Sequence, residues 1–338
     1  MILASKPFEL NLKYPFSISG YSRRFTPIMF VSISFEGFVG LGEASMVPYL
    51  GESLDSASCF LSKVDLNGFK PPFNYDEVIN YLDAVDQGNP AIKAAIDIAL
   101  HDLEGKLENK PCYKLFGSDP DKMPLTSVTI GIDSQEVIIK KVMEAESARV
   151  LKVKLGSDED KKLIKTIRTI SSKPLYVDAN QGWTDKEKAL DLIYWLEEMG
   201  VELIEQPMSK SDFGSNAWLT ERSPIPIIAD EAVQRLADLT AVKEAYHGIN
   251  VKLMKSGGMH EAWLMIKKAR ELNMKVLIGC MSETSVATLA AASLAPLCDW
   301  ADIDGPFLTT NNPFEMPEFE NGKWVLGETA GLGVTDFK

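Results

Sequence analysis

The sequence predicts an α/β protein, a modified (β/α) TIM-type barrel with an N-terminal α+β capping domain, on three observations. From about residue 123, eight short β-branched runs alternate with amphipathic stretches of helical period. Polar residues near the ends of these runs are spaced 24 to 27 residues apart. No glycine-rich phosphate loop follows the first run, which disfavours an open doubly wound sheet. The end residues are Thr129, Lys154, Asp178, Glu205, Asp230, Lys255, Cys280 and Asp304.

The capping domain is predicted over residues 1–122, where the pattern differs. Residues 6–16 and 26–44 are typical of strands, and the second strand is expected to bend at its glycines. Helices are expected near 74–86 and 90–109, the second with Asn89 as its cap and Pro90 in its first turn.

The barrel itself is predicted over residues 123–312. Asp119, Pro120 and Pro124 indicate a linker just before it. The tail, residues 313–338, is rich in glycine and is expected to form a hairpin and a loop that pack back on the capping domain and complete it.

Composition excludes several classes of function. A net charge of −13 disfavours nucleic acid and anionic membranes as partners. No apolar run reaches the roughly 18 residues of a membrane span, and the N-terminus lacks the apolar core of a secretory signal. Three histidines without metal-ligand spacing make a histidine-based zinc site improbable. The four cysteines form no CxxC motif, so we expect reduced thiols and a cytoplasmic location. We also expect a small-molecule partner and a homo-oligomer.

The third, fourth and fifth predicted strands end in the carboxylates Asp178, Glu205 and Asp230. Strand ends of a barrel converge on one mouth, and three carboxylates this close repel one another unless a cation lies among them. Each acid alone could instead cap the following helix. Three such acids in consecutive units favour a single Mg²⁺ ion per subunit, held by oxygen ligands.

Lysines stand on both sides of this predicted metal site. Lys152 and Lys154 are two residues apart in one strand, so they point to the same face, and Lys255 is assigned to the strand after Asp230. Each could be a solvated surface lysine. Beside a metal, Lys154 and Lys255 are better interpreted as acid–base groups, because a nearby positive charge and desolvation lower a lysine pKa. Lys152 supplies part of that charge and can donate to an anionic substrate oxygen.

These residues resemble the enolase superfamily in its muconate-lactonizing subgroup. The resemblance rests on the KxK pattern of Lys152 and Lys154, the three acids, and the KxxKxGG motif from Lys252 to Gly258. It covers nearly the whole chain and implies Mg²⁺-assisted removal of a proton next to a carboxylate. The seventh strand ends in Cys280 rather than histidine, which argues against the mandelate-racemase branch.

The eighth strand narrows the resemblance to dipeptide epimerases. Asp302 and Asp304 resemble their DxD motif, which receives the free ammonium group of a dipeptide. The resemblance implies an isomerase that inverts the α-carbon of the C-terminal residue, with Lys154 and Lys255 on opposite faces of that carbon. An o-succinylbenzoate synthase or a muconate-type cycloisomerase of the same subgroup remains the alternative.

Further residues are expected to position the substrate. Asn180 and Glu231 are candidates to orient the lysines or the ligands of the metal. On the capping loop, Tyr21 occupies the place where members of the family acting on Ala-Glu carry an arginine, with Arg23 and Arg24 following. This difference favours Ala-X substrates in which X is small or hydrophobic, while Ala-Glu stays possible. The remaining candidates for substrate contact are Thr129, Cys280, Met281 and Ser282.

Overall fold

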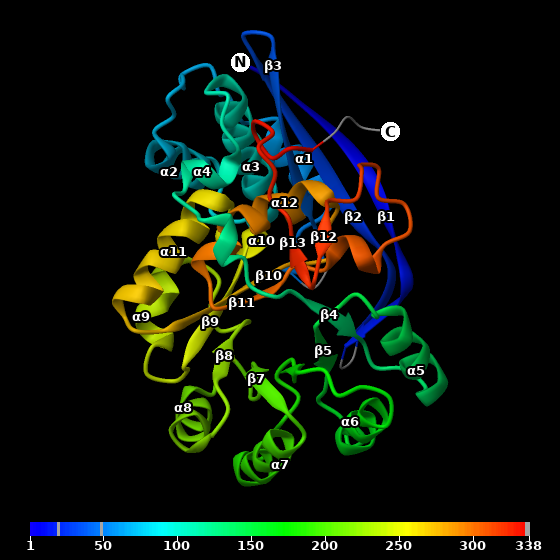
Figure 1. The fold of residues 1–338 in the computed structure, drawn as a ribbon. Helices are drawn as coiled ribbons and strands as arrows, with labels where there is room; N and C mark the ends of the chain where they lie inside the picture. The colour runs from blue at the N-terminus through cyan, green and yellow to red at the C-terminus, as the bar shows by residue number, and fades with distance from the viewer. Residues whose placement is uncertain (19–20, 48–49, 335–338) are drawn as a thin grey trace.

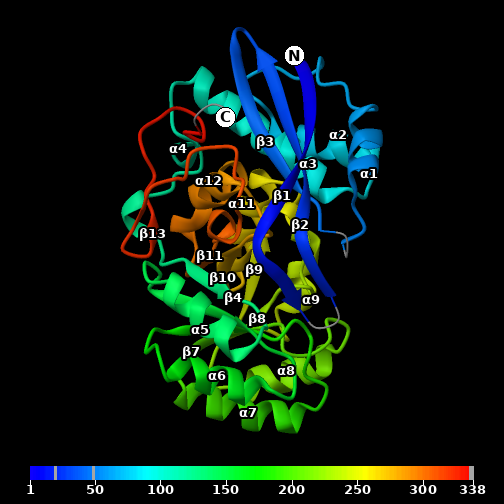
Figure 2. The same cartoon turned by 90° about the vertical axis from the view of Figure 1, so that its right-hand side faces the viewer.

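The computed structural model describes residues 1–18, 21–47 and 50–334, without the side chains of residues 16–18 and 21. An antiparallel sheet and a group of helices form the capping part, above a ring of parallel strands with helices outside it (Figure 1). Figure 2 shows the long strands β1 and β2 running from the capping part down over the side of the barrel. Among the described residues, no helix has both the length and the apolar character that a membrane crossing requires.

The capping sheet consists of three antiparallel strands, β1 (Ile2–Ile18), β2 (Tyr21–Phe35) and β3 (Phe38–Ser45). The prediction of a single bent strand over 26–44 was wrong. Glu36 and Gly37 have φ values of 48° and 84°, so the chain reverses there in a tight hairpin. Gly40 and Gly42 do not bend the strand but let it approach a helix, because a Cβ at either position would collide with carbonyl oxygens of that helix.

Four helices of the described chain accompany this sheet: α1 (Leu54–Leu61), α2 (Tyr75–Val85), α3 (Pro90–Leu107) and α4 (Cys112–Leu115). The helices expected near 74–86 and 90–109 are therefore confirmed as α2 and α3. Asn89 is the N-cap residue of α3 and Pro90 opens the helix, as expected, but the side chain of Asn89 makes no capping hydrogen bond. The carboxylate of Glu52 instead accepts from the N–H groups of Ala91 and Ile92 at 3.0–3.4 Å, and so satisfies the start of α3.

The barrel region holds one parallel sheet of eight strands in the described chain, in chain order from β4 to β11. A single bridge between Thr126 and Ala301 joins the first strand to the last and closes the ring. This confirms the predicted barrel and its eight strands, apart from the end of the sixth. The strands are β4 (Ser127–Ile130), β5 (Val150–Lys154), β6 (Leu175–Asp178), β7 (Val201–Glu205), β8 (Ile227–Ala229), β9 (Gly248–Lys252), β10 (Lys275–Gly279) and β11 (Trp300–Asp302).

Helices lie between these strands and cover the outside of the ring (Figure 1). They are α5 (Gln135–Glu144), α6 (Asp160–Arg168), α7 (Lys186–Glu198), α8 (Phe213–Arg222), α9 (Leu239–Val242), α10 (Leu253–Ser256), α11 (Met259–Glu271) and α12 (Ser285–Leu294). Short 3₁₀ turns add η2 (Pro120–Lys122), η3 (Leu236–Asp238), η4 (Ala295–Leu297) and η5 (Gly305–Leu308).

One strand assignment of the sequence has to be corrected. Strand β9 ends at Lys252, and Lys255 lies in the one-turn helix α10, not on the strand. The chain leaves the sheet there and then passes through Gly257 and Gly258, whose φ values of 78° and 129° suit glycine. Lys252 therefore occupies the strand end that the sequence had assigned to Lys255.

The tail after η5 contains a short hairpin, β12 (Phe319–Glu320) with β13 (Lys323–Trp324). Beyond it, the N–H of Gly331 donates to the carbonyl of Lys110, and the N–H of Cys112 donates to the carbonyl of Gly331. These bonds join the tail to the capping part of the chain. The domain limits given above stay predictions.

Candidate active site

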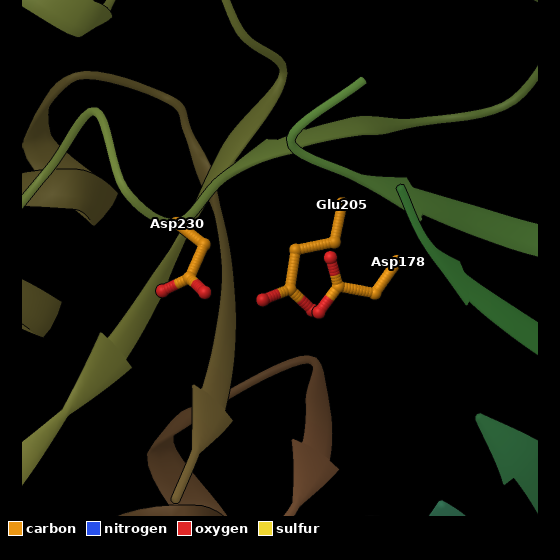
Figure 3. Close-up of side chains that lie close together, drawn as sticks. All are labelled: Asp178, Glu205 and Asp230. Atoms are coloured by element: carbon orange, nitrogen blue, oxygen red, sulfur yellow. The ribbon is translucent and has the colours of Figure 1, made fainter. Parts of the chain in front are cut away.

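Three buried carboxylates meet at the carboxyl end of the barrel, as Figure 3 shows. Asp178 ends β6, Glu205 ends β7 and Asp230 directly follows β8. Asp178 and Glu205 are register partners, so they point to the same side of the sheet. One ligand oxygen from each residue lies within 4.8 Å of the other two.

The charge of this trio fits a hard divalent cation. Burial and the neighbouring charge of Asp178 raise the pKa of Glu205 to about 8, so the three groups resist being ionised together. An ion with oxygen preference placed among them would remove that repulsion, and three carboxylates leave coordination positions for water and substrate. The residues present therefore suit the predicted metal.

Glu205 is held from two opposite strands. Lys152 on β5 donates to Oε2 at 2.6 Å, and the amide of Asn250 on β9 donates to Oε1 at 2.7 Å. Lys152 also lies 2.7 Å from Asp302 and 3.3 Å from Asp178. Although burial disfavours its charge, the carboxylates of Asp302, Glu205 and Asp178 hold the pKa of Lys152 well above its usual value. Lys152 is thus a fixed cation at the floor of the site.

A second pair of polar side chains lies two residues further along strands β5 and β9. Lys154 on β5 donates to Oδ2 of Asp178 at 2.6 Å, and Lys252 on β9 donates to Oδ2 of Asp230 at 2.7 Å. Strands β5 and β9 are four apart in a ring of eight, so these two ammonium groups approach the trio from opposite walls. Lys252 was named in a motif but not predicted as a site residue, although it follows inward-facing Asn250 by two residues, as Lys154 follows Lys152.

Lys255 has different surroundings. Its ammonium donates to Oδ1 and to the backbone oxygen of Asp230, at 2.6 and 2.7 Å. It also donates to the carbonyls of Val233 and Asn250, each at 3.0 Å. Burial lowers the pKa of this lysine. A lowered pKa suits a base, but this ammonium faces the outer side of Asp230 and is surrounded by backbone oxygens.

Asp302 ends the last strand, β11, whereas Asp304 lies just beyond it before η5, and the two acids differ in their partners. Asp302 already accepts from Lys152 and from the hydroxyl of Ser127, at 2.7 Å each. Asp304 accepts from the backbone N–H of Thr129 at 2.7 Å and has the thiol of Cys280 at 3.7 Å. Burial, with the charge of Asp302, raises the pKa of Asp304 to about 6. Asp304 is therefore the acid whose charge is less compensated.

The capping strand β2 supplies one arginine to the site. Arg23 donates to the hydroxyl of Ser282 at 2.8 Å, and the hydroxyl of Ser45 donates to the carbonyl of Ser282 at 2.7 Å. Arg24 is exposed, as the alternation of a strand requires. The side chain of Tyr21 lies outside the described residues.

The two polar residues predicted to orient the site are adjacent to each other. The amide of Asn180 donates to Glu231 at 3.4 Å, and the N–H of Asn180 donates to Asp178 at 2.9 Å. Burial and the neighbouring charge of Asp230 raise the pKa of Glu231 to about 7. Both residues therefore lie beside the metal ligands that they were expected to support.

These groups line one cavity of about 350 Å³, within the range of small-molecule sites. Of the predicted residues it includes Arg23, Thr129, Lys152, Lys154, Asn180, Asp230, Glu231, Lys255, Cys280, Met281, Ser282, Asp302 and Asp304. Lining residues that the sequence analysis missed are Leu50, Gln181, Lys210, Gln234, Lys252 and Leu308. Asp178 and Glu205 lie beneath it, fully buried.

Two family patterns match the chain. Residues 5–117 match the family described as mandelate racemase / muconate lactonizing enzyme, N-terminal domain. Residues 137–335 match the family described as enolase C-terminal domain-like. Together they cover the capping sheet from residue 5 and the barrel from residue 137, after its first strand β4.

Individual proteins give similar matches. An L-Ala-D/L-Glu epimerase of Bacteroides thetaiotaomicron is 49% identical over 97% of this chain and 86% of its own. An L-Ala-D/L-amino acid epimerase of Pedosphaera parvula is 39% identical over 98% of this chain and 94% of its own. The crystal structure of a dipeptide epimerase from Enterococcus faecalis, complexed with Mg and the dipeptide L-Leu-L-Tyr, has a TM-score of 0.90, with 31% identity over 99% of each chain.

Proposed function

The chain belongs to the mandelate racemase / muconate lactonizing enzyme family of the enolase superfamily, and from this premise we propose that it is a dipeptide epimerase. In this proposal the enzyme, an isomerase, inverts the α-carbon of the C-terminal residue by moving one proton off it and another onto it. The names of the three similar proteins support this activity.

The observation that carries the proposal is the placement of Lys154 and Lys252. Their ammonium groups come from opposite strands and flank the three carboxylates. Inversion needs access to both faces of the α-carbon, so one lysine removes the proton and the other returns a proton to the opposite face. Acid–base catalysis of this kind contributes roughly 10²–10⁴-fold. Lys255, which the sequence favoured for this role, is the alternative that variants can test.

The acidic trio is the proposed site of one Mg²⁺ ion per subunit. Asp178, Glu205 and Asp230 would hold it, and the Enterococcus faecalis complex with Mg supports this assignment. When bound, the ion would stabilise the negative charge that develops on the substrate carboxylate. Lys152, a permanent cation beside the trio, would donate to the same carboxylate.

Asp304 is the proposed receptor for the ammonium group of the dipeptide. Its charge is only partly compensated, whereas Asp302 is already paired with Lys152. A substrate without an amine would leave Asp304 without a cation in a buried site, which is costly. This argues against the o-succinylbenzoate synthase and cycloisomerase alternatives.

The second residue of the dipeptide is proposed to be acidic. The sequence favoured a small or hydrophobic residue because Tyr21 stands where an arginine was expected. Arg23, however, lines the cavity from the capping strand, and a guanidinium is suited to a carboxylate. The name of the Bacteroides thetaiotaomicron relative supports the same choice. L-Ala-L-Glu is therefore the proposed substrate class.

A panel of dipeptides in D₂O with Mg²⁺ tests the proposal by mass spectrometry. Deuterium uptake at the C-terminal α-carbon of L-Ala-L-Glu, with formation of L-Ala-D-Glu, is the expected result. The panel should include L-Ala-L-Leu, to test the side-chain preference, and a succinylbenzoate precursor. Turnover of that precursor without exchange in any dipeptide would contradict the proposal.

A cytoplasmic location is part of the proposal, supported by the four cysteines, all of which are described and unpaired. The homo-oligomer expected from the sequence stays a prediction.

A further inference from the structure

The short loop after β8 carries one metal ligand and is held from both neighbouring strands. On the β7 side, the side-chain oxygen of Gln206 accepts from the N–H groups of Asp230 and Ala232, at 3.0 and 3.1 Å. The amide of Gln206 is itself fixed, since it donates to the hydroxyl of Tyr246 at 2.8 Å and to the carbonyl of Met208 at 3.1 Å. The N–H groups of Asp230 and Ala232 therefore donate to a side chain that is itself held in place by hydrogen bonds.

On the β9 side, Lys255 holds the oxygens of the same loop. Its three N–H bonds are shared among the side chain and carbonyl of Asp230 and the carbonyls of Val233 and Asn250. The side chain of Lys255 is 3% exposed, so it is shielded from bulk water. A buried ammonium surrounded by oxygens of the loop behaves as a fixed cross-link between β9 and the loop.

The two oxygens of Asp230 have separate partners. Oδ2 is bonded to Lys252, which also lies 3.9 Å from Glu205, so this oxygen faces the other carboxylates. Oδ1 is bonded to Lys255. Lys255 therefore fixes the outer oxygen of the carboxylate and leaves the inner one directed at the centre of the trio.

We propose that Lys255 is a positioning residue that orients Asp230 for the divalent cation, and that it carries no proton to or from the substrate. The proposal rests on the metal site of the proposed function. It gives the two lysines of the KxxKxGG motif different roles: Lys252 transfers a proton, and Lys255 holds the metal ligand Asp230 in place. Hydrogen-bond partners of metal ligands are typically worth 10- to 100-fold in metal affinity.

Calorimetric titration of the full chain with Mg²⁺ alone tests this. Lys255→Gln keeps part of the hydrogen bonding, Lys255→Met removes all of it, and Lys268→Gln, on the exposed side of α11, is the matched control. We expect the Kd for Mg²⁺ to rise about 10- to 100-fold in the Lys255 variants and to stay unchanged in the control. At saturating Mg²⁺, the variants should recover dipeptide exchange to within about tenfold, with an unchanged pH profile.

An unchanged or tighter Kd in a folded Lys255 variant would overturn the proposal. Exchange that stays abolished at saturating Mg²⁺, with the Kd unchanged, would make Lys255 a proton carrier instead. If neither variant folds by circular dichroism, even with Mg²⁺ present, the lysine serves the fold and the proposal is also wrong. Failure of the wild type to exchange any dipeptide would contradict the proposed function alone, because the affinity comparison needs no substrate.

Discussion

The ammonium nitrogen of Lys252 lies 2.7 Å from Oδ2 of Asp230, the oxygen that faces the other two carboxylates. A cation bound by Asp230 would compete with Lys252 for this oxygen. Binding of a metal would therefore favour release of the lysine toward the cavity, where the substrate is proposed to lie.

This competition predicts that Lys252→Met binds Mg²⁺ at least as tightly as the wild type, since the change removes a competing cation. The same variant should lose epimerisation by roughly 10²-fold or more, because one proton carrier is missing. Calorimetry and mass spectrometry measure the two quantities separately. A Kd more than about tenfold weaker, in a folded variant, would contradict the competition.

Removal of the metal is predicted to stop exchange at the α-carbon. With EDTA in excess, deuterium uptake from D₂O should fall to background, and added Mg²⁺ should restore it. Asp178→Asn should need far more Mg²⁺ for the same rate, because one of the three ligand charges is lost. Exchange that continues at full rate in EDTA would disprove the metal assignment.

The pH dependence of binding follows from Asp304. Its pKa is raised to about 6, so this carboxylate, the proposed receptor of the substrate ammonium, is ionised above pH 6 and protonated below it. We expect kcat/KM for L-Ala-L-Glu to rise with pH through about 6. Asp304→Asn should raise KM strongly and remove this rise from the pH profile of kcat/KM. If this variant keeps both the rise of kcat/KM near pH 6 and a normal KM, Asp304 does not bind the substrate ammonium group.

The preference of the enzyme for the side chain of the second dipeptide residue is predicted to depend on Arg23. Arg23→Met should raise KM for L-Ala-L-Glu by about 10- to 100-fold, the usual worth of a charged hydrogen bond. The KM for L-Ala-L-Leu should change by less than about threefold. Arg24→Met is the matched control, because Arg24 is exposed and outside the cavity lining. Equal effects of the two variants on L-Ala-L-Glu would contradict the assignment.

Stability is predicted to depend on Glu52, which caps α3. Burial raises its pKa to about 6 from the ordinary 4.5, so the folded state favours the protonated form. As pH rises from well below 4.5 to well above 6, this group should reduce the free energy of unfolding by about 2 kcal/mol in total, with most of the loss between these two values. Urea unfolding of Glu52→Gln should lack this contribution, whereas Glu108→Gln, on an exposed carboxylate after α3, should keep it.

The sequence predicted the features that depend on local pattern. Eight strand ends at a regular interval were enough to place Asp178, Glu205 and Asp230 in one mouth, because a barrel brings its strand ends together. The same reasoning could not separate Lys252 from Lys255. Both belong to one motif, and the choice depends on where the backbone leaves β9 for a helical turn.

Long-range contacts account for the other differences. Glu52 caps α3 from 39 residues away, and no local pattern distinguishes it from Asn89, which stands at the usual cap position. Arg23 reaches the site because its strand runs down from the capping part over the barrel. Its place beside Ser282 depends on how the capping sheet packs against the barrel, which sequence periodicity does not encode.

The most direct test of the central claim is isotope exchange by three variants at saturating Mg²⁺, each started from L-Ala-L-Glu and from L-Ala-D-Glu. We expect Lys154→Met and Lys252→Met both to fail to epimerise, and each to exchange the α-hydrogen of at most one isomer, a different one in each case. Lys255→Met should exchange both isomers. Epimerisation at the wild-type rate by Lys252→Met, with total loss in Lys255→Met, would contradict the account.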